Sequence, residues 1–544
     1  MGFAARRIAP DLENLEPGQE ARVIVRYKVH MEARHHRSIE RRGGRLLHSL
    51  RVLNGAAYTV PAAALADLAN DPDVEYVAPD RPVKAMLDYA EPAVNANIAF
   101  QNNWTGAGVT VAVIDSGIMD THPDLQNSGA SRVVYAEDFN PSEGNDYFDR
   151  LGHGTHVAGI LGGNASMSSG SSYTRTFRGI APKVKFVNLR VLDRQGNGTD
   201  SMVIAAIQRA IALKSTYHIR IINLSLGRPV FESYTVDPLC QAVEQAWKAG
   251  IVVVVAAGND GRNNSAGTSG YATISSPGND PYVITVGAIK DMKTLSRTDD
   301  QMASYSSKGP TLFDHLAKPD LVAPGNKIIS TVPAGLGLTN SYPGNCVPQN
   351  YYISGAIAQP STYYYEMSGT SMATPVVSGA AALLLQKQPS LTPDQVKARL
   401  MKTATKAFPA STVSTDPVTG ATYTVYNDLF TVGAGYLDVW AALNNIDLAT
   451  APATSPAVTY DPVAGTVSLV TGSNVVWGTN VVWGTNVVWG TSTLQANNVV
   501  WGTNVVWGTS TMQGFNVVWG TNVVWGTSSQ TTGEGTTLAL SGDN

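Results

Sequence analysis

The chain has 544 residues, of which 43% are hydrophobic and 15% charged, and its formal net charge is −4. This length predicts two to four structural units, and the charge balance excludes the basic surface needed to bind nucleic acid or an anionic membrane. The two cysteines, Cys240 and Cys346, can pair, but their spacing predicts neither a metal site nor a disulfide framework. No apolar run approaches the roughly 20 residues that cross a bilayer, so no transmembrane segment is expected.

Residues 1–20 form an N-terminal segment that contains Arg6 and Arg7. The segment lacks the apolar core of about 7–15 residues that a signal peptide requires. Two interpretations stay open: an intracellular protein, or a protein whose true start lies upstream of Met1.

Residues 21–85 carry a compact pattern of their own. ARVIVRYK predicts a strand, MEARHHRSIERRGG a polar helix, HSLRVLNGAAYTV two strands, PAAALADLANDPDV a helix and VEYVAPD a last strand. The order β-α-β-β-α-β predicts a small ferredoxin-like α+β domain.

Between residues 86 and 448 short apolar strands alternate with amphipathic helices. The expected strands are 109–115, 184–192, 219–227, 251–259 and 282–289, and the expected helices are 155–163, 200–213 and 238–250. Apolar strands that alternate with helices predict an α/β fold with a doubly wound parallel sheet. Because ligands bind beyond the carboxyl ends of such strands, the polar residues there are of interest, namely Asp115, Ser225 and Asn259.

Three motifs in this region carry residues that suit hydrolysis by a serine. AVIDSGI ends a strand with Asp115, GHGTHVAGI opens a helix with His153, and GTSMATP places Ser371 where a turn becomes an apolar helix. A nucleophilic serine needs a base and a carboxylate that orients the base, and a helix N-terminus favours the oxyanion. Each residue alone is more simply a cap or a turn residue. Their joint occurrence favours a catalytic interpretation.

The three motifs resemble the Asp, His and Ser motifs of the subtilisin-like (subtilase, peptidase S8) serine proteases, in that family's chain order. The resemblance spans residues 21–448 and implies a serine endopeptidase that acts through an acyl-enzyme and needs no cofactor for catalysis. It implies that Asp115 orients the imidazole, His153 is the base and Ser371 the nucleophile. Asn259, in VVAAGND, matches the family's oxyanion residue.

The same resemblance implies where protein or peptide substrates bind. LSLG matches an edge strand that pairs with an extended peptide, and ISSPGNDPYV matches the floor of the specificity pocket. A serine at that floor and the lack of an obvious carboxylate favour broad specificity with a preference for apolar side chains. The expected substrate-binding residues are Ser225, Leu226, Gly227, Ala257, Gly258 and Ser275.

The expected metal content departs from that of many subtilisins. Asp124, in THPDL, matches a calcium ligand of the family, but the loop NASMSSGSSYTRTF lacks the Asn-rich turn that supplies its partners. One carboxylate offers too few of the 6–8 oxygen ligands that calcium takes. No metal ligand is therefore expected; a structural calcium ion stays possible, and a capping role for Asp124 is simpler.

The N-terminal unit resembles the family's inhibitory (I9-type) propeptide, on the segments NGAAYTVP and LADLANDPDVEYVAPD. The resemblance implies a zymogen whose own propeptide is an intramolecular inhibitor and is cut off between about Asp80 and Asp88. The alternative is an interaction domain that stays attached. A propeptide favours a secreted protein, with a cytoplasmic one as the alternative, and the enzyme is expected to be a monomer.

A linker at 449–473 leads to seven copies of NVVWGT within residues 474–527, followed by a tail at 528–544. The insertions STLQAN and STMQGF are six residues long and start 18 residues apart, which suits a three-sided β-helix with 18 residues per coil. Stacked short strands, or a segment that orders on a partner, are alternatives. The uncharged repeats can self-associate and are expected to be dispensable for proteolysis.

Two other functions compete with the endopeptidase. One is a catalytically inactive scaffold whose repeats act as a surface or adhesive module. The other is an esterase or another acyl hydrolase, which fits the triad but not LSLG or the propeptide.

Overall fold

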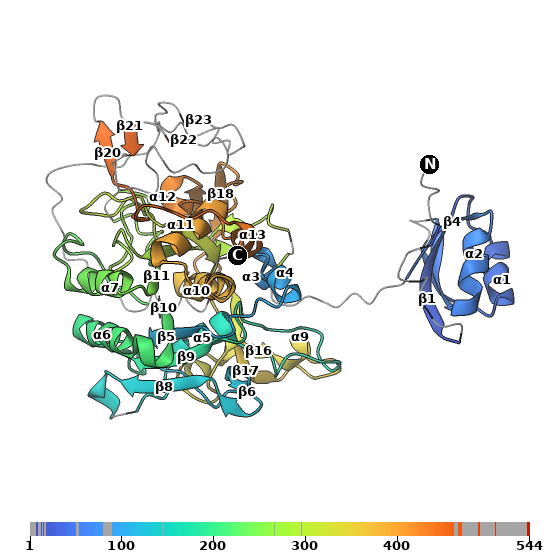
Figure 1. The fold of residues 1–544 in the computed structure, drawn as a ribbon, viewed down its shortest axis with the longest axis horizontal. Helices are drawn as coiled ribbons and strands as arrows, with labels where there is room; N and C mark the ends of the chain where they lie inside the picture. The colour runs from blue at the N-terminus through green and yellow to red at the C-terminus, as the bar shows by residue number, and fades with distance from the viewer. Residues whose placement is uncertain are drawn as a thin grey trace. The chain divides into compact units, whose positions relative to one another are not determined.

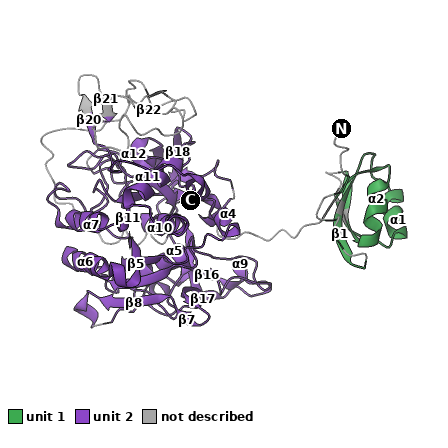
Figure 2. Ribbon diagram, viewed as in Figure 1, with its two compact units in different colours: residues 1–85 green, residues 86–544 purple. Residues whose placement is uncertain are grey.

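A computed structural model describes residues 18–50, 54–79, 90–144, 146–265, 267–294, 296–461, 466–469, 488–489, 506–507 and 541–543, with the single residues 7, 8, 12 and 15. The chain divides into two compact units, Met1–Ala85 and Met86–Asn544 (Figures 1 and 2).

The first unit is a four-stranded antiparallel sheet with two helices. Its elements, in chain order, are β1 (Glu20–Tyr27), α1 (Ala33–Arg41), β2 (Arg45–Leu50), β3 (Gly55–Pro61), α2 (Leu65–Asn70) and β4 (Val74–Pro79). The strands lie in the order β2-β3-β1-β4. Alternate residues of β1, including Val23 and Val25, are buried, as expected when one face of a sheet is covered. The β-α-β-β-α-β order expected from the sequence is present.

The second unit is built on a sheet of parallel strands. The strands are β8 (Val133–Asp138), β9 (Lys185–Arg190), β5 (Thr110–Asp115), β10 (Ile219–Leu224), β11 (Val252–Ala256), β12 (Ile284–Lys290) and β14 (Leu321–Pro324), with the antiparallel β13 (Gln301–Met302) beside β12. Every residue of β5, β11 and β12 is buried. Such continuous burial follows because a parallel sheet is covered on both faces.

Helices cover the two faces of this sheet. The helices α5 (His153–Gly162) and α10 (Thr370–Lys387) pack together, and α10 also lies against β10, β11, β12 and β14. On the other side, α6 (Asp200–Tyr217) contacts β5 and β10, while α7 (Pro238–Lys248) contacts β11 (Figure 1). The predicted α/β fold is confirmed.

Several elements of the second unit are additional to those predicted from the sequence. They are α4 (Ala96–Gln101), β15 (Ile328–Thr331), β16 (Cys346–Pro348), β17 (Pro360–Met367), α11 (Pro393–Thr403), β18 (Ser411–Thr415), β19 (Thr422–Tyr426) and α13 (Val439–Asn444). Cys240 and Cys346 are both free and buried. Among the described residues, no helix has the length and apolar character of a membrane span.

Part of the expected linker at 449–473 packs on the second unit. Ala453, Ser455 and Val458 are buried, and the Ser455 hydroxyl donates to Asp320 Oδ1 at 2.6 Å. Truncation near Ala449 would therefore remove buried parts of this unit. The prediction that the C-terminal region is dispensable is accordingly restricted to the repeats, residues 474–527.

Most of the repeat region lies outside the described residues. The exceptions are β22 (Val488–Trp489) and β23 (Val506–Trp507), which pair in parallel with Val488 opposite Val506 and Trp489 opposite Trp507. The paired residues are 18 positions apart (506 − 488), the length of the proposed coil. The β-helix itself stays a prediction.

Candidate active site

The end of β5 and the start of α5 bring Asp115 and His153 together. His153 Nδ1 lies 2.7 Å from Asp115 Oδ1, and the carboxylate is buried while the imidazole keeps 16% of its surface exposed. The start of α5 can lie this close to the end of β5 only because residue 154 is glycine. A Cβ on Gly154 would lie 2.2 Å from the Gly117 carbonyl oxygen. With Nδ1–H donating to Asp115, Nε2 is left as the basic nitrogen.

The two histidines of GHGTH have opposite pKa shifts. Burial lowers the pKa of His153, but the charge and hydrogen bond of Asp115 and the charge of Asp149 outweigh it, so the net pKa is raised. His156 is fully buried, its Nε2 lies 3.0 Å from the Tyr365 carbonyl oxygen, and burial lowers its pKa to about 3. His156 is therefore a neutral packing residue, and only His153 is placed to exchange protons near neutral pH.

Ser371 lies in the first turn of α10, beside the end of β10. Its hydroxyl donates to the Ser225 carbonyl oxygen at 3.0 Å, and the Ser225 hydroxyl donates back to the Ser371 carbonyl oxygen at 2.8 Å. These two bonds hold the N-terminus of α10 against the carboxyl edge of the sheet. In this geometry the Ser371 hydroxyl is turned to Ser225 and not to His153, and catalytic hydrogen bonds often form only when substrate is present.

Asn259 follows β11 and lies beside the start of α10. Its side-chain oxygen accepts hydrogen bonds from the Thr370 amide at 2.9 Å and the Thr370 hydroxyl at 3.1 Å. Among the described residues, none accepts a hydrogen bond from the Asn259 side-chain NH2 group. The half-buried amide is thus held by its oxygen, with its donor available next to Ser371.

The expected substrate-binding residues lie around this edge. Leu226 and Gly227 are partly or fully exposed, and their backbones make no hydrogen bond to any other described residue, whereas Arg228 pairs with Ser276 through two backbone bonds of 3.0 and 2.8 Å. Ser275 donates its amide to the Ala257 carbonyl oxygen at 2.9 Å. A Cβ on Gly258 would lie 2.4 Å from Ser275 Oγ, so Ser275 occupies the space beside Gly258.

Asp149 is a buried residue of this site that the sequence analysis missed. Its Oδ1 accepts hydrogen bonds from the Leu151 and Gly152 amides, at 3.1 and 2.8 Å, and its Oδ2 accepts from the Thr155 amide at 2.8 Å. Oδ1 also accepts from the Ser116 hydroxyl at 2.9 Å. Asp149 therefore satisfies two of the free amides at the start of α5, those of Gly152 and Thr155, while the Gly154 amide donates to the Ser116 hydroxyl. No periodicity in the sequence marks Asp149, because its partners are backbone amides and the distant Ser116 hydroxyl.

Asp149→Asn is expected to lower the free energy of unfolding by about 1–3 kcal/mol, because either orientation of the new amide points an NH2 group at an N–H or O–H donor. Urea unfolding in a Ser371→Ala background, which prevents self-digestion, measures this change. Asp299→Asn, which removes an exposed carboxylate, is the matched control. Equal stability of the two variants would contradict the capping role.

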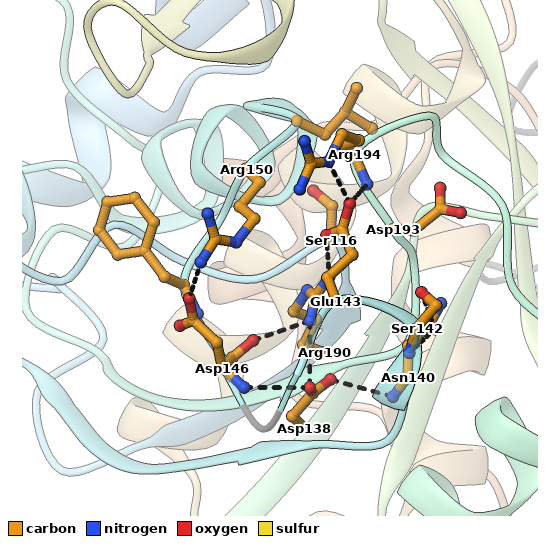
Figure 3. A network of polar contacts seen from close by, with 12 residues as sticks. Ser116, Asp138, Asn140, Ser142, Glu143, Asp146, Arg150, Arg190, Asp193 and Arg194 are labelled. Atoms are coloured by element: carbon orange, nitrogen blue, oxygen red, sulfur yellow. Dashed lines mark hydrogen bonds and ion pairs between the residues drawn. The ribbon is translucent and has the colours of Figure 1, made fainter.

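The loop that leads to Asp149 is anchored by the buried Arg190 (Figure 3). Arg190 pairs in register with Asp115 on one side and Asp138 on the other. Its guanidinium donates to Asp138 Oδ2 at 3.1 Å, to Glu143 Oε2 at 2.5 Å and to the Asp146 carbonyl oxygen at 2.8 Å. Strand β9, next to the site, thus fixes the loop that leads to Asp149 and to helix α5, whose first residue is His153.

The residues around Asp124 do not fit a calcium ion. Asp124 is buried; its Oδ1 accepts from the Ser166 hydroxyl and the Met167 amide, both at 2.9 Å, and its Oδ2 accepts from the Tyr364 hydroxyl at 2.7 Å. Both oxygens are engaged by donors, whereas calcium needs several free oxygen ligands. Within the described residues no group of three or more His, Cys, Asp or Glu side chains could hold a metal ion. Asp124 instead ties the loop after α5 to β17.

Comparison with known proteins identifies the family of the chain. The model of the subtilase family (peptidase S8) matches residues 106–435. The chain is 40% identical to serine protease AprX of Bacillus subtilis (strain 168) over 357 residues, which are 64% of this chain and 73% of that protein. It is 35% identical to subtilisin E of the same organism over 393 residues, 71% of this chain and 86% of subtilisin E.

A third relative comes from another genus. The extracellular serine proteinase of Thermus sp. (strain Rt41A) is 34% identical over 365 residues, 65% of this chain and 71% of the relative. The family match covers more than half of the chain and includes all three motifs. The chain therefore belongs to the subtilase family and is a serine-type endopeptidase.

Proposed function

We propose that this endopeptidase cleaves peptide bonds with Asp115, His153 and Ser371 as its catalytic triad and Asn259 as an oxyanion donor. The observation that carries the proposal is the 2.7 Å contact between His153 Nδ1 and Asp115 Oδ1, at the sheet edge to which Ser371 is tied. The contact keeps the proton on Nδ1, so Nε2 can act as the base.

In the first step His153 Nε2 takes the Ser371 hydroxyl proton while Oγ bonds to the substrate carbonyl carbon. The oxygen that becomes negative accepts hydrogen bonds from the Asn259 side-chain NH2 and from the Ser371 amide, which has no acceptor within its own helix. His153 then gives the proton to the leaving amine as the C–N bond breaks. Water, deprotonated by His153, hydrolyses the acyl-enzyme and regenerates the Ser371 hydroxyl.

Substrate recognition rests on the backbone of Ser225, Leu226 and Gly227. Since the last two make no hydrogen bond within the described structure, they can pair with an extended peptide of any sequence. Ser275, beside Gly258, supplies a small polar floor for one side chain. These features favour broad specificity for proteins and peptides, and they favour peptides over simple esters.

The N-terminal unit is the proposed propeptide, which inhibits the enzyme until it is cut off between about Asp80 and Asp88. The support is its separate hydrophobic core and its β-α-β-β-α-β order. A parallel sheet pairs distant segments and folds slowly, so a folding template has a clear use. Secretion is proposed too, since one relative is named an extracellular proteinase.

A fluorophosphonate probe tests the proposal, because it labels only an activated serine. Mass spectrometry of the labelled protein should place the probe on Ser371, and unlabelled protein should digest casein. A folded, processed protein that takes no label would favour the inactive scaffold. Labelled protein that hydrolyses esters but not casein would favour an acyl hydrolase.

The raised pKa of His153 predicts the pH dependence of the reaction. The base must be neutral, so kcat/KM falls as pH drops through the His153 pKa, and a raised pKa moves this fall to higher pH. The acid limb is expected to have its midpoint above 6.5, the ordinary value for histidine. Measuring kcat/KM from pH 5 to 9 with an uncharged peptide substrate checks this, and a midpoint below 6.5 contradicts it.

A further inference from the structure

The side chain of Asp543 is buried in the second unit, although it lies beyond the repeats in the sequence. Its Oδ1 accepts from the Ser304 hydroxyl at 2.8 Å and from the Arg262 guanidinium, and its Oδ2 accepts from the Ser304 amide at 2.6 Å. Its backbone pairs with the Asn326 side chain, with an N–H···Oδ1 bond of 2.8 Å and an Nδ2–H···O bond of 3.1 Å. The contacts recognise both an aspartate side chain and its peptide backbone.

The residue before it has to be glycine. Gly542 has φ +61°, and a Cβ there would lie 2.3 Å from Ser368 Oγ and 2.5 Å from Asn326 Oδ1. Ser368 cannot easily withdraw, because its hydroxyl accepts the Lys327 amide at 2.9 Å. The site therefore selects a Gly-Asp pair by shape as well as by charge.

The surroundings of this pair connect it with the catalytic residues. Arg262 lies three residues after Asn259, and Ser368 lies three residues before Ser371. The Gly369 amide donates to the Gly325 carbonyl oxygen at 2.8 Å. Asn326, which follows Gly325, therefore belongs to the segment that holds the residues just before Ser371. The docked segment thus bridges the two chain segments that supply the proposed oxyanion donors.

We propose that the catalytic unit has a second peptide-binding site, which takes a Gly-Asp segment and is filled by this chain's own Gly542 and Asp543. Occupation of the site holds the Asn259 and Ser371 segments in their catalytic positions. It also attaches the repeat region at both ends, because Val458 before the repeats is bonded to the His315 carbonyl oxygen at 2.7 Å. The catalytic consequence rests on the proposed roles of Asn259 and Ser371, whereas the binding itself does not.

Peptide binding to full-length Ser371→Ala protein tests the site. Gly542→Val empties it by the clash described above. Gly344→Val is the control, since a Cβ on Gly344 would meet no atom of the described residues within 4 Å. A fluorescein-labelled, C-terminally amidated Leu-Ser-Gly-Asp-Asn peptide should bind the Gly542→Val protein at least tenfold more tightly than the control, in which the tethered segment competes at about millimolar effective concentration.

The sequence of the peptide provides the specificity test. The same peptide carrying Asp543→Asn should bind about 10- to 100-fold more weakly, because hydrogen bonds to the charged carboxylate are lost. Leu-Ser-Asp-Gly-Asn, of identical composition, should not bind. The proposed site would be overturned if the Gly-Asp peptide bound both proteins equally or bound neither. It would also be overturned if the three peptides bound equally.

Turnover by active protein tests the catalytic consequence. Gly542→Val should lower kcat for a short peptide substrate about 10- to 100-fold with little change in KM, the size expected when catalytic groups move by about 1 Å. Adding the Gly-Asp peptide should restore kcat, and the Asp-Gly peptide should not. The positioning role is overturned if kcat is unchanged, or if kcat falls and the bound peptide does not restore it. If fluorophosphonate labelling also fails in the unmutated protein, it is the proposed function that fails.

Discussion

Ser371→Ala is expected to lower kcat for peptide hydrolysis about 10⁶-fold, the magnitude known for the nucleophile of subtilisin itself and not one obtained from these distances. In the proposed mechanism the variant loses the Oγ atom that forms the acyl-enzyme. Its fold should persist, because the substitution removes a single hydrogen bond, from Ser371 Oγ to the Ser225 carbonyl oxygen, worth about 0.5–1.5 kcal/mol. Stopped assays with a fluorogenic peptide at high enzyme concentration measure the residual rate.

The same variant also tests self-processing. If the N-terminal unit is a propeptide that the enzyme removes, the Ser371→Ala chain should stay at full length, whereas unmutated protein is shortened between about Asp80 and Asp88. Ser354→Ala, which removes an exposed hydroxyl, should behave as the unmutated protein in both assays. If the Ser371→Ala chain is already shortened between about Asp80 and Asp88 when it is purified, another protease removes the N-terminal unit.

The strand-end residues were predictable because the sequence marks a buried parallel strand clearly. Asp115 is the last residue of β5, Ser225 directly follows β10, and Asn259 lies three residues after the end of β11. Continuous apolar runs locate such strands, and the topology of a parallel sheet brings their carboxyl ends to one edge. The His153 helix was predictable from its glycine-rich start, and Gly154 has the physical role of letting α5 approach β5.

The features that were missed depend on contacts between distant residues. Asp149 lies in a polar loop without periodicity, and Arg190 looks like the exposed end of a strand although it is fully buried. Asp543 contacts Ser304, which is 239 residues away in the sequence. A buried ionic group has no local signature, because its partners, and not its neighbours in the chain, compensate for its lost hydration.

Asp115→Asn is expected to lower kcat about 10⁴-fold, a loss of the size known for the aspartates of serine protease triads, subtilisin among them. In this chain Asp115 Oδ1 accepts both the His153 Nδ1–H and, at 2.7 Å, the Ser116 amide. An asparagine that places its NH2 group at the Oδ1 position points it at the Ser116 amide, which is also a donor. It also favours the histidine tautomer whose proton is on Nε2 and not on Nδ1. An asparagine that keeps its oxygen at the Oδ1 position buries its NH2 group at the Oδ2 position, where no described residue offers a hydrogen-bond partner. Both orientations remove the charge that, in the proposed mechanism, stabilises the imidazolium formed during the reaction.

The pH profile separates this electrostatic role from a purely structural one. Because the charge and the hydrogen bond of Asp115 raise the pKa of His153, removing them should move the acid limb of kcat/KM to lower pH while the rate falls. Asp120→Asn, at a half-buried carboxylate five residues along the chain, should change neither quantity. A folded Asp115→Asn enzyme with the acid limb of the unmutated protein would mean that Asp115 does not act on His153. The carboxylate would then matter only for holding the end of β5 against α5.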